Sequence, residues 1–156
     1  MSVRAVAALA ALAWAGLGVA RADLPPPPEV SPASLGPVVV RGAATPAHTF
    51  AKGLGTAQVF FDAASGSPEV ALALLVLKPG AAVAAHVHAD SVELLYVLEG
   101  QAEMRVGAET LTIGPGDAAR IPKGVEHTAR VLGKRSLRAL QLYMPPGPEQ
   151  RFKLQR

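Results

Sequence analysis

Cysteine is absent from all 156 residues. No disulfide can therefore support the fold, and an oxidising compartment poses no hazard to it. The absence also excludes a lipoprotein anchor, which needs a cysteine directly after an N-terminal apolar segment. Whatever holds this chain together must be a packed core or a bound ion.

A strong excess of one charge is also absent once the N-terminal segment is set aside. Arg4 and Arg21 precede residue 23, which leaves 13 basic residues against 12 acidic ones and a net charge of +1. A near-neutral protein gives no electrostatic reason to expect nucleic acid or an anionic membrane as a partner.

The one strongly hydrophobic segment lies at the N-terminus, where residues 1–22 predict a secretory signal peptide. Arg4 supplies a positive start, residues 6–19 are almost wholly apolar, and Ala20-Arg21-Ala22 offers a cleavage site before Asp23. The apolar run is shorter than the roughly 20 residues that span a bilayer, although an uncleaved anchor is the alternative. We expect a periplasmic or secreted protein of 134 residues that has no membrane contact after cleavage.

Residues 23–37, DLPPPPEVSPASLGP, predict a linker. Four consecutive prolines favour an extended polyproline conformation and cannot donate backbone hydrogen bonds to a sheet. A spacer between the signal and the folded domain explains this composition. A proline-rich ligand for a recognition module is the alternative.

Residues 38–156 lack any sustained helical periodicity and predict an all-β domain. Short apolar runs recur about every 8–12 residues between glycine and proline turns, as in a β-sandwich or barrel. The expected strands are VVVR (38–41), QVFFD (58–62), VALALLVL (70–77), AVAAHVH (82–88), ELLYVLE (93–99), AEMRV (102–106), TLTI (110–113), AARI (118–121), HTARVL (127–132) and LRALQLYM (137–144). The polar C-terminal segment PPGPEQRFKLQR is expected to pack outside the barrel.

Four residues on these strands predict a metal site: His86, His88, Glu93 and His127. Two histidines separated by one residue point to the same face of a strand. Neutral imidazole suits Zn, Cu, Fe and Ni, and a carboxylate widens the choice to Mn. Four protein ligands leave two positions open on an octahedral ion, whereas a closed tetrahedral arrangement would indicate a structural zinc.

The spacing around these residues resembles the two motifs of the cupin family. Matching positions are Gly80, His86, His88, Glu93 and Gly100 in the first motif, and Gly116, Pro122, Gly124 and His127 in the second. The resemblance covers residues 70–144 and implies a single jelly-roll β-barrel, a divalent transition metal held by the four residues, and a homodimer. Val131 replaces the asparagine that ends the second motif. Because Val131 should share the inward face of His127, we expect a more apolar pocket.

Further polar residues are weaker candidates. Glu93 could also serve as an acid or base if it left the metal, and Glu126 should point away from the pocket as a solvated charge. Gln141 and Tyr143 share one face of the last strand, where they either orient a metal ligand or lie on an outward polar face. His48 is expected at the surface. Arg120 could hold an anionic substrate or lie on an exposed face.

Three functions remain open from the sequence. The first is a metal-dependent enzyme, of dioxygenase, isomerase, decarboxylase or lyase type, acting on a small organic molecule. The second is a non-catalytic protein that binds or senses a small ligand or the metal. The third is a barrel with a purely structural metal. An apolar pocket with few polar groups is the usual form of a small-molecule site, but no obvious acid or base remains once the four ligands are assigned.

Overall fold

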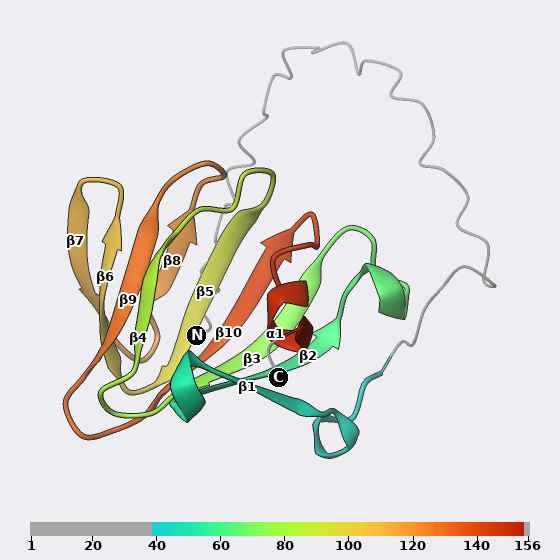
Figure 1. Cartoon of the computed structure of the whole chain (residues 1–156), viewed down its shortest axis with the longest axis horizontal. Coiled ribbons are helices and arrows are strands. Elements are labelled where there is room, and N and C mark those ends of the chain that lie inside the picture. Colours follow the sequence, from blue (N-terminus) through green and yellow to red (C-terminus); the bar gives the residue numbers. More distant parts are fainter. Residues whose placement is uncertain (1–38, 155–156) are drawn as a thin grey trace, which may run out of the picture.

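The computed structural model describes residues 39–154, which form two antiparallel β-sheets facing each other (Figure 1). One sheet has the strand order β1-β2-β3-β10-β5-β8, and the other has the order β4-β9-β6-β7. The strands are β1 (Ala47–Phe50), β2 (Gly55–Phe61), β3 (Ala71–Leu77), β4 (Ala82–His86), β5 (Val92–Glu99), β6 (Gln101–Val106), β7 (Glu109–Ile113), β8 (Ala118–Ile121), β9 (His127–Leu132) and β10 (Leu137–Met144). A short helix, α1 (Gln150–Leu154), follows them. The prediction of an all-β jelly-roll fold is confirmed.

The core lies between the two sheets and follows the period of two in the sequence. Side chains of β3 and β10 alternate strictly between buried and half-buried, because successive side chains on a strand point to opposite faces. The inward side chains of both sheets meet in one cluster, and most of them are aliphatic. Its larger members are Leu75, Leu77, Leu95, Val97, Met104, Ile113, Ile121, Val131, Leu137, Tyr143 and Phe152.

Gly100 allows the chain to pass from one sheet to the other in a single residue. It lies between the end of β5 and the start of β6, with a left-handed φ of 76°. A Cβ atom at this position would lie 2.3 Å from the backbone oxygen of Ser136, so a residue with a side chain cannot fit without backbone movement. The second glycine of the first motif is therefore required by backbone packing.

The N-terminal part of the domain differs from the sequence prediction. Residues 39–41 form no strand, so the strand expected at 38–41 is wrong, and Val38 lies outside the described residues. The first strand is instead β1, which pairs with β2. Its AHTF sequence is too short and mixed to show alternation, and tertiary contacts determine its conformation.

The C-terminal segment forms α1, whose Phe152 is only 1% exposed. The Phe152 ring packs on the ring of Phe50 with centroids 4.9 Å apart. Asp62, at the end of β2, accepts hydrogen bonds from Gln150 and Lys153. The segment is thus fastened to the six-stranded sheet by one buried aromatic contact and one buried polar cluster.

The predicted signal peptide and linker lie outside the described residues. No helix within residues 39–154 is long and apolar enough to cross a membrane.

Candidate metal centre

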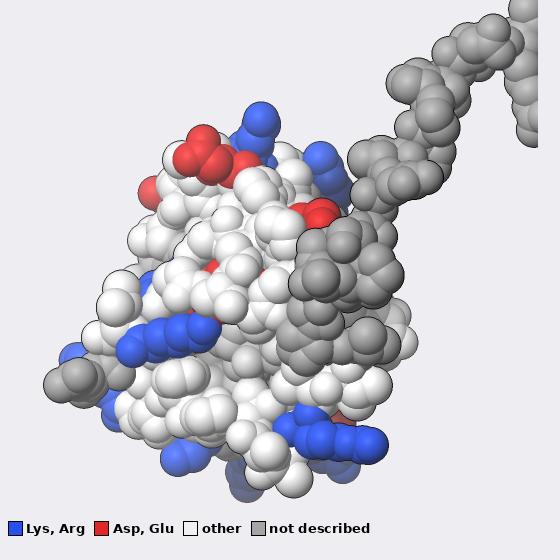
Figure 2. Space-filling model, turned by 90° about the vertical axis from the view of Figure 1, so that its right-hand side faces the viewer, with Lys and Arg blue, Asp and Glu red and all other residues white. Residues whose placement is uncertain are grey.

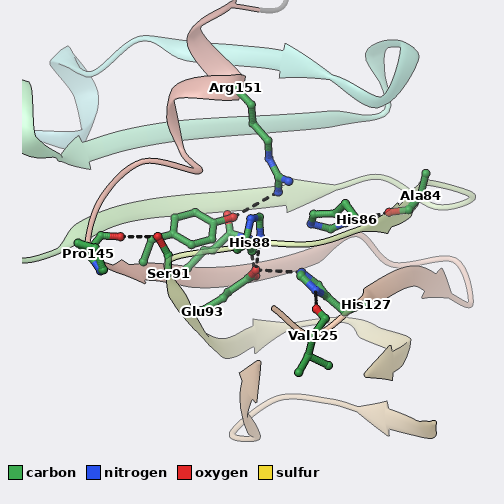
Figure 3. A network of polar contacts seen from close by, with 11 residues as sticks. Ala84, His86, His88, Ser91, Glu93, Val125, His127, Pro145 and Arg151 are labelled. Carbon is green, nitrogen blue, oxygen red and sulfur yellow. Dashed lines mark hydrogen bonds and ion pairs between the residues drawn. The ribbon is translucent and has the colours of Figure 1, made fainter. Parts of the chain in front are cut away.

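Three strands and one loop bring together all four of the predicted ligand residues (Figure 3). His86 ends β4, His88 follows it, Glu93 lies on β5 and His127 begins β9. One potential ligand atom from each residue lies within 4.8 Å of all the others. His86 and His127 are direct cross-strand partners, which explains why two distant parts of the sequence meet here.

Glu93 is the hub of the cluster and is 3% exposed. Its Oε2 atom lies 3.0 Å from Nε2 of His88 and 3.2 Å from Nε2 of His127. Its Oε1 atom accepts a 2.7 Å hydrogen bond from Nε2 of Gln141 on β10. Gln141 thus orients the carboxylate, as sequence reasoning had allowed, and it does not lie on an outward face.

Backbone carbonyl groups orient two of the imidazoles. Nδ1 of His86 lies 2.8 Å from the oxygen of Ala84, and Nδ1 of His127 lies 2.9 Å from the oxygen of Val125. A carbonyl can only accept, so each Nδ1 carries the proton and each Nε2 presents a lone pair.

The lone pairs on Nε2 of His86 and Nε2 of His127 are available to bind a metal ion. Nε2 of His86 and Nε2 of His127 are both buried and make no hydrogen bond. Nε2 of His127 lies 3.2 Å from Oε2 of Glu93, but the two atoms do not have hydrogen-bonding geometry. Buried polar atoms without partners are rare and costly, and a cation shared by the imidazoles and the carboxylate would satisfy them. The donor set therefore fits a divalent transition metal.

The electrostatics of the cluster keep two of its donor groups, the His86 imidazole and the Glu93 carboxyl group, deprotonated. Burial alone would raise the pKa of Glu93, but the close contact with His127 and the hydrogen bonds from His88 and Gln141 outweigh it and lower the pKa to about 2. Burial lowers the pKa of His86 to about 4, assisted by the positive charge of Arg151. Burial is the largest effect on His127 and acts to lower its pKa, but the contact with the Glu93 carboxylate and the hydrogen bond to the Val125 carbonyl together outweigh it and raise the pKa. His86 and Glu93 are thus a neutral imidazole and a carboxylate at neutral pH.

A small apolar cavity adjoins the cluster on the inner side. About 30 Å³ is open to the centres of water molecules, which is room for an ion and one or two waters. The polar lining comes from His86, Glu93, His127, Thr128 and Gln141, and the rest is Leu75, Leu77, Val83, Leu95, Ala102, Met104, Ala129 and Leu137. Oε1 of Gln141 is buried without a partner, so this cavity contains one hydrogen-bond acceptor ready for a ligand or water.

The weaker sequence candidates fall into clear positions. Glu126 is exposed and pairs with Arg105 at 2.6 Å, and Arg120 is exposed on β8. His48 lies on β1, outside the cluster. Val131 is buried in the core on the inward face, as predicted, but it does not line the cavity. The expectation that it would line the pocket is wrong, because the cavity reaches only as far along β9 as Ala129.

Sequence reasoning missed Arg151 and left Tyr143 undecided. Tyr143 is fully buried, with its ring edge-on to that of His88 at 5.0 Å. Nη2 of Arg151 donates a 3.2 Å hydrogen bond to the Tyr143 hydroxyl. The inward period of β10 through Gln141 and Tyr143 could have placed both side chains at the site. No local signal identified Arg151, because its position depends on the packing of α1.

Comparison with known proteins agrees with this geometry. The model of the cupin domain matches residues 73–143. These residues form a cupin domain. The chain is 28% identical over 78 residues to the polyketide synthase CurC of Streptomyces cyaneus, a match that covers 50% of this chain and 51% of that protein. This chain thus matches only about half the length of its curated relative.

Solved structures show the same cupin fold. KdgF from a Halomonas species superposes with a TM-score of 0.62 at 20% identity, covering 70% of this chain and 94% of that one. A predicted oxalate decarboxylase from Thermotoga maritima superposes with a TM-score of 0.63 at 20% identity, covering 69% and 98%. At these identities the likeness concerns the cupin fold alone.

Proposed function

We propose that this protein is an exported metal-dependent enzyme that acts on a small organic molecule. His86, His88, Glu93 and His127 would hold one divalent transition metal of the Fe, Mn, Zn, Ni or Cu group. The observation that carries the proposal is the pair of buried, unpartnered Nε2 atoms of His86 and His127, which face a carboxylate within one cluster. Structural zinc sites are closed by their four ligands, whereas this cluster borders a cavity that a ligand or water can enter.

The metal would supply Lewis acidity and open coordination positions. The chain's own residues supply the rest of the site. Nε2 of Gln141 donates to Oε1 of Glu93 and holds the carboxylate in place. The carbonyls of Ala84 and Val125 hold two imidazoles in the ligating tautomer. The aliphatic lining excludes bulk water and lowers the local dielectric constant, which strengthens every polar contact made inside.

The size and lining of the cavity support a small substrate. A space of about 30 Å³ beside the cluster admits a few heavy atoms unless side chains move. The names of two relatives, a polyketide synthase and a predicted oxalate decarboxylase, also favour an enzyme of small-molecule chemistry.

A non-catalytic binding protein is the second candidate function. It is favoured by one observation: among the described residues the only carboxylate in the cluster is Glu93, which is itself a proposed metal ligand. A protein that senses or sequesters a metal-bound ligand needs no additional acid or base.

The proposed partners are limited to small molecules and a second copy of this chain. Leucines at outward positions of β3, β5 and β10 lie side by side, with Leu140 between Leu74 and Tyr96, and Tyr96 is 44% exposed. An apolar sheet face of this kind favours a homodimer. We propose no nucleic-acid partner, since residues 23–156 carry a net charge of only +1. On the one face that Figure 2 shows, basic side chains lie around a largely uncharged centre.

The experiment that tests the proposal compares metal-loaded and metal-free protein for turnover. Purified protein is depleted with a chelator, reloaded separately with Fe, Mn, Zn, Ni or Cu, and incubated with small organic acids and with phenolic or diketone substrates. Oxygen uptake or product formation that requires one of these metals, and that His86→Ala loses, is the expected result. His48→Ala is the control, because His48 lies outside the cluster. Ligand binding without turnover under every loading would favour the binding protein instead.

A further inference from the structure

Arg151 projects from α1 toward the histidine cluster, although it belongs to neither sequence motif (Figure 3). Nη2 of Arg151 donates to the hydroxyl of Tyr143, whose ring contacts His88. Neither Arg151 nor Tyr143 lines the apolar cavity. The cluster therefore has an aliphatic side and a second side formed by a guanidinium and a phenol.

The position of Arg151 is fixed by its two neighbours along the chain. Phe152 is buried in the core against Phe50. Lys153 makes an ion pair with Asp62, which is only 2% exposed. These contacts hold the backbone of Arg151 in place, and its guanidinium lies over the Phe152 ring at 5.0 Å from the centroid.

The charge of Arg151 is not neutralised by any described residue. Arg105, Arg130 and Arg138 each pair with a glutamate at 2.6–3.0 Å. By contrast, no carboxylate among residues 39–154 lies within 4.0 Å of the guanidinium of Arg151. The hydrogen bond from Arg151 to Tyr143 uses one of the five N–H donors of the guanidinium. A half-buried guanidinium with free donors is a site for an anion.

The positive charge of Arg151 beside a proposed metal site also requires a physical explanation. A divalent ion and Arg151 would contribute three positive charges, against the single negative charge of Glu93. An uncompensated cation disfavours metal binding, and an anionic ligand shared by the metal and the guanidinium would offset that repulsion.

The Tyr143 hydroxyl adds a second donor. It accepts from Arg151, and its own hydrogen has no acceptor among the described residues. A phenol keeps its proton at neutral pH and can donate it in a hydrogen bond to an oxyanion.

We propose that Arg151 and the Tyr143 hydroxyl bind the carboxylate group of the substrate beside the metal ligands, so that the protein selects small organic acids. Arg151 presents a planar fork of N–H groups that matches a carboxylate. This inference rests on the proposed metal site, because the carboxylate would lie between that site and Arg151.

The test measures ligand binding to cobalt-loaded protein from the visible spectrum of the bound Co²⁺. Glycolate is the carboxylate probe. Imidazole is the neutral probe, which needs only an open coordination position on the Co²⁺ ion. In Arg151→Gln we expect the dissociation constant for glycolate to rise by about ten- to a hundredfold, because the variant loses hydrogen bonds to a charged group. The constant for imidazole should change less than about twofold. Arg151→Lys should recover part of the glycolate affinity, because it restores the charge without the fork.

Two further variants separate the possible failures. Arg120→Gln removes an exposed arginine and should leave both constants unchanged, while Tyr143→Phe should weaken glycolate alone, even if Arg151→Gln does not fold. Equal glycolate affinity in the native protein, Arg151→Gln and Tyr143→Phe would overturn the inference and leave the metal site standing. A native protein that takes up no Co²⁺ would instead overturn the proposed function and, with it, this inference.

Discussion

Gln141 offers a sensitive test of the proposed metal centre, because it contacts Glu93 without being a ligand itself. Nε2 of Gln141 donates a 2.7 Å hydrogen bond to Oε1 of the buried carboxylate. Gln141→Leu keeps a similar volume and removes that bond. A hydrogen bond to a charged group contributes about 1.5–3 kcal/mol, which corresponds to a factor of roughly 10–150 in affinity. Loss of partners that orient metal ligands typically costs 10–100-fold, so the two estimates agree.

The assay is a competition titration of Zn²⁺ between the protein and a chromophoric chelator. We expect Gln141→Leu to bind Zn²⁺ about 10–100 times more weakly than the native protein. Gln101→Leu is the matched control, because Gln101 is exposed at the start of β6. Folding of both variants is checked by circular dichroism. A folded Gln141→Leu whose Zn²⁺ affinity is within twofold of the native value would refute the assignment of Glu93 as a ligand positioned by Gln141.

Three further predictions concern the stability of the fold. Gly100→Ala should lower the free energy of unfolding in urea by more than about 3 kcal/mol, since its Cβ meets backbone at 2.3 Å; Gly133→Ala, with a similar φ and open space, should cost only about 1–2 kcal/mol. Hydrogen bonds hold the pKa of Asp62 at about 2 against the effect of burial, so stability should fall by about 2 kcal/mol between pH 4 and pH 2. In Asp62→Asn, this decrease in stability between pH 4 and pH 2 should be smaller. Phe152→Ala should cost about 3–5 kcal/mol in the same urea assay.

Much of this fold could be predicted because its strands carry period-two patterns between glycine turns. β3, β5, β9 and β10 begin and end within one residue of their expected positions. His86 and His127 could be assigned to one cluster because motif spacing encodes their pairing across two strands.

The remaining features depend on contacts between distant residues. β1 is defined by its pairing with β2, since its own four residues favour no conformation strongly. The position of Arg151 follows from the packing of Phe152 on Phe50, and no local pattern in PPGPEQRFKLQR predicts that contact. The sequence left two interpretations of Gln141 open, and the register of β10 against β5, which places it opposite Leu95 and beside Glu93, decides between them.

The central claim is that His86, His88, Glu93 and His127 hold a metal ion, and metal analysis of protein purified from its native compartment tests it most directly. The account predicts about one divalent transition-metal ion per chain in the native protein and in His48→Ala, and a loss of most of that metal in His86→Ala and in His127→Ala. A folded native protein that contains no such metal and takes up none, or a His127→Ala variant that retains a full complement, would contradict it.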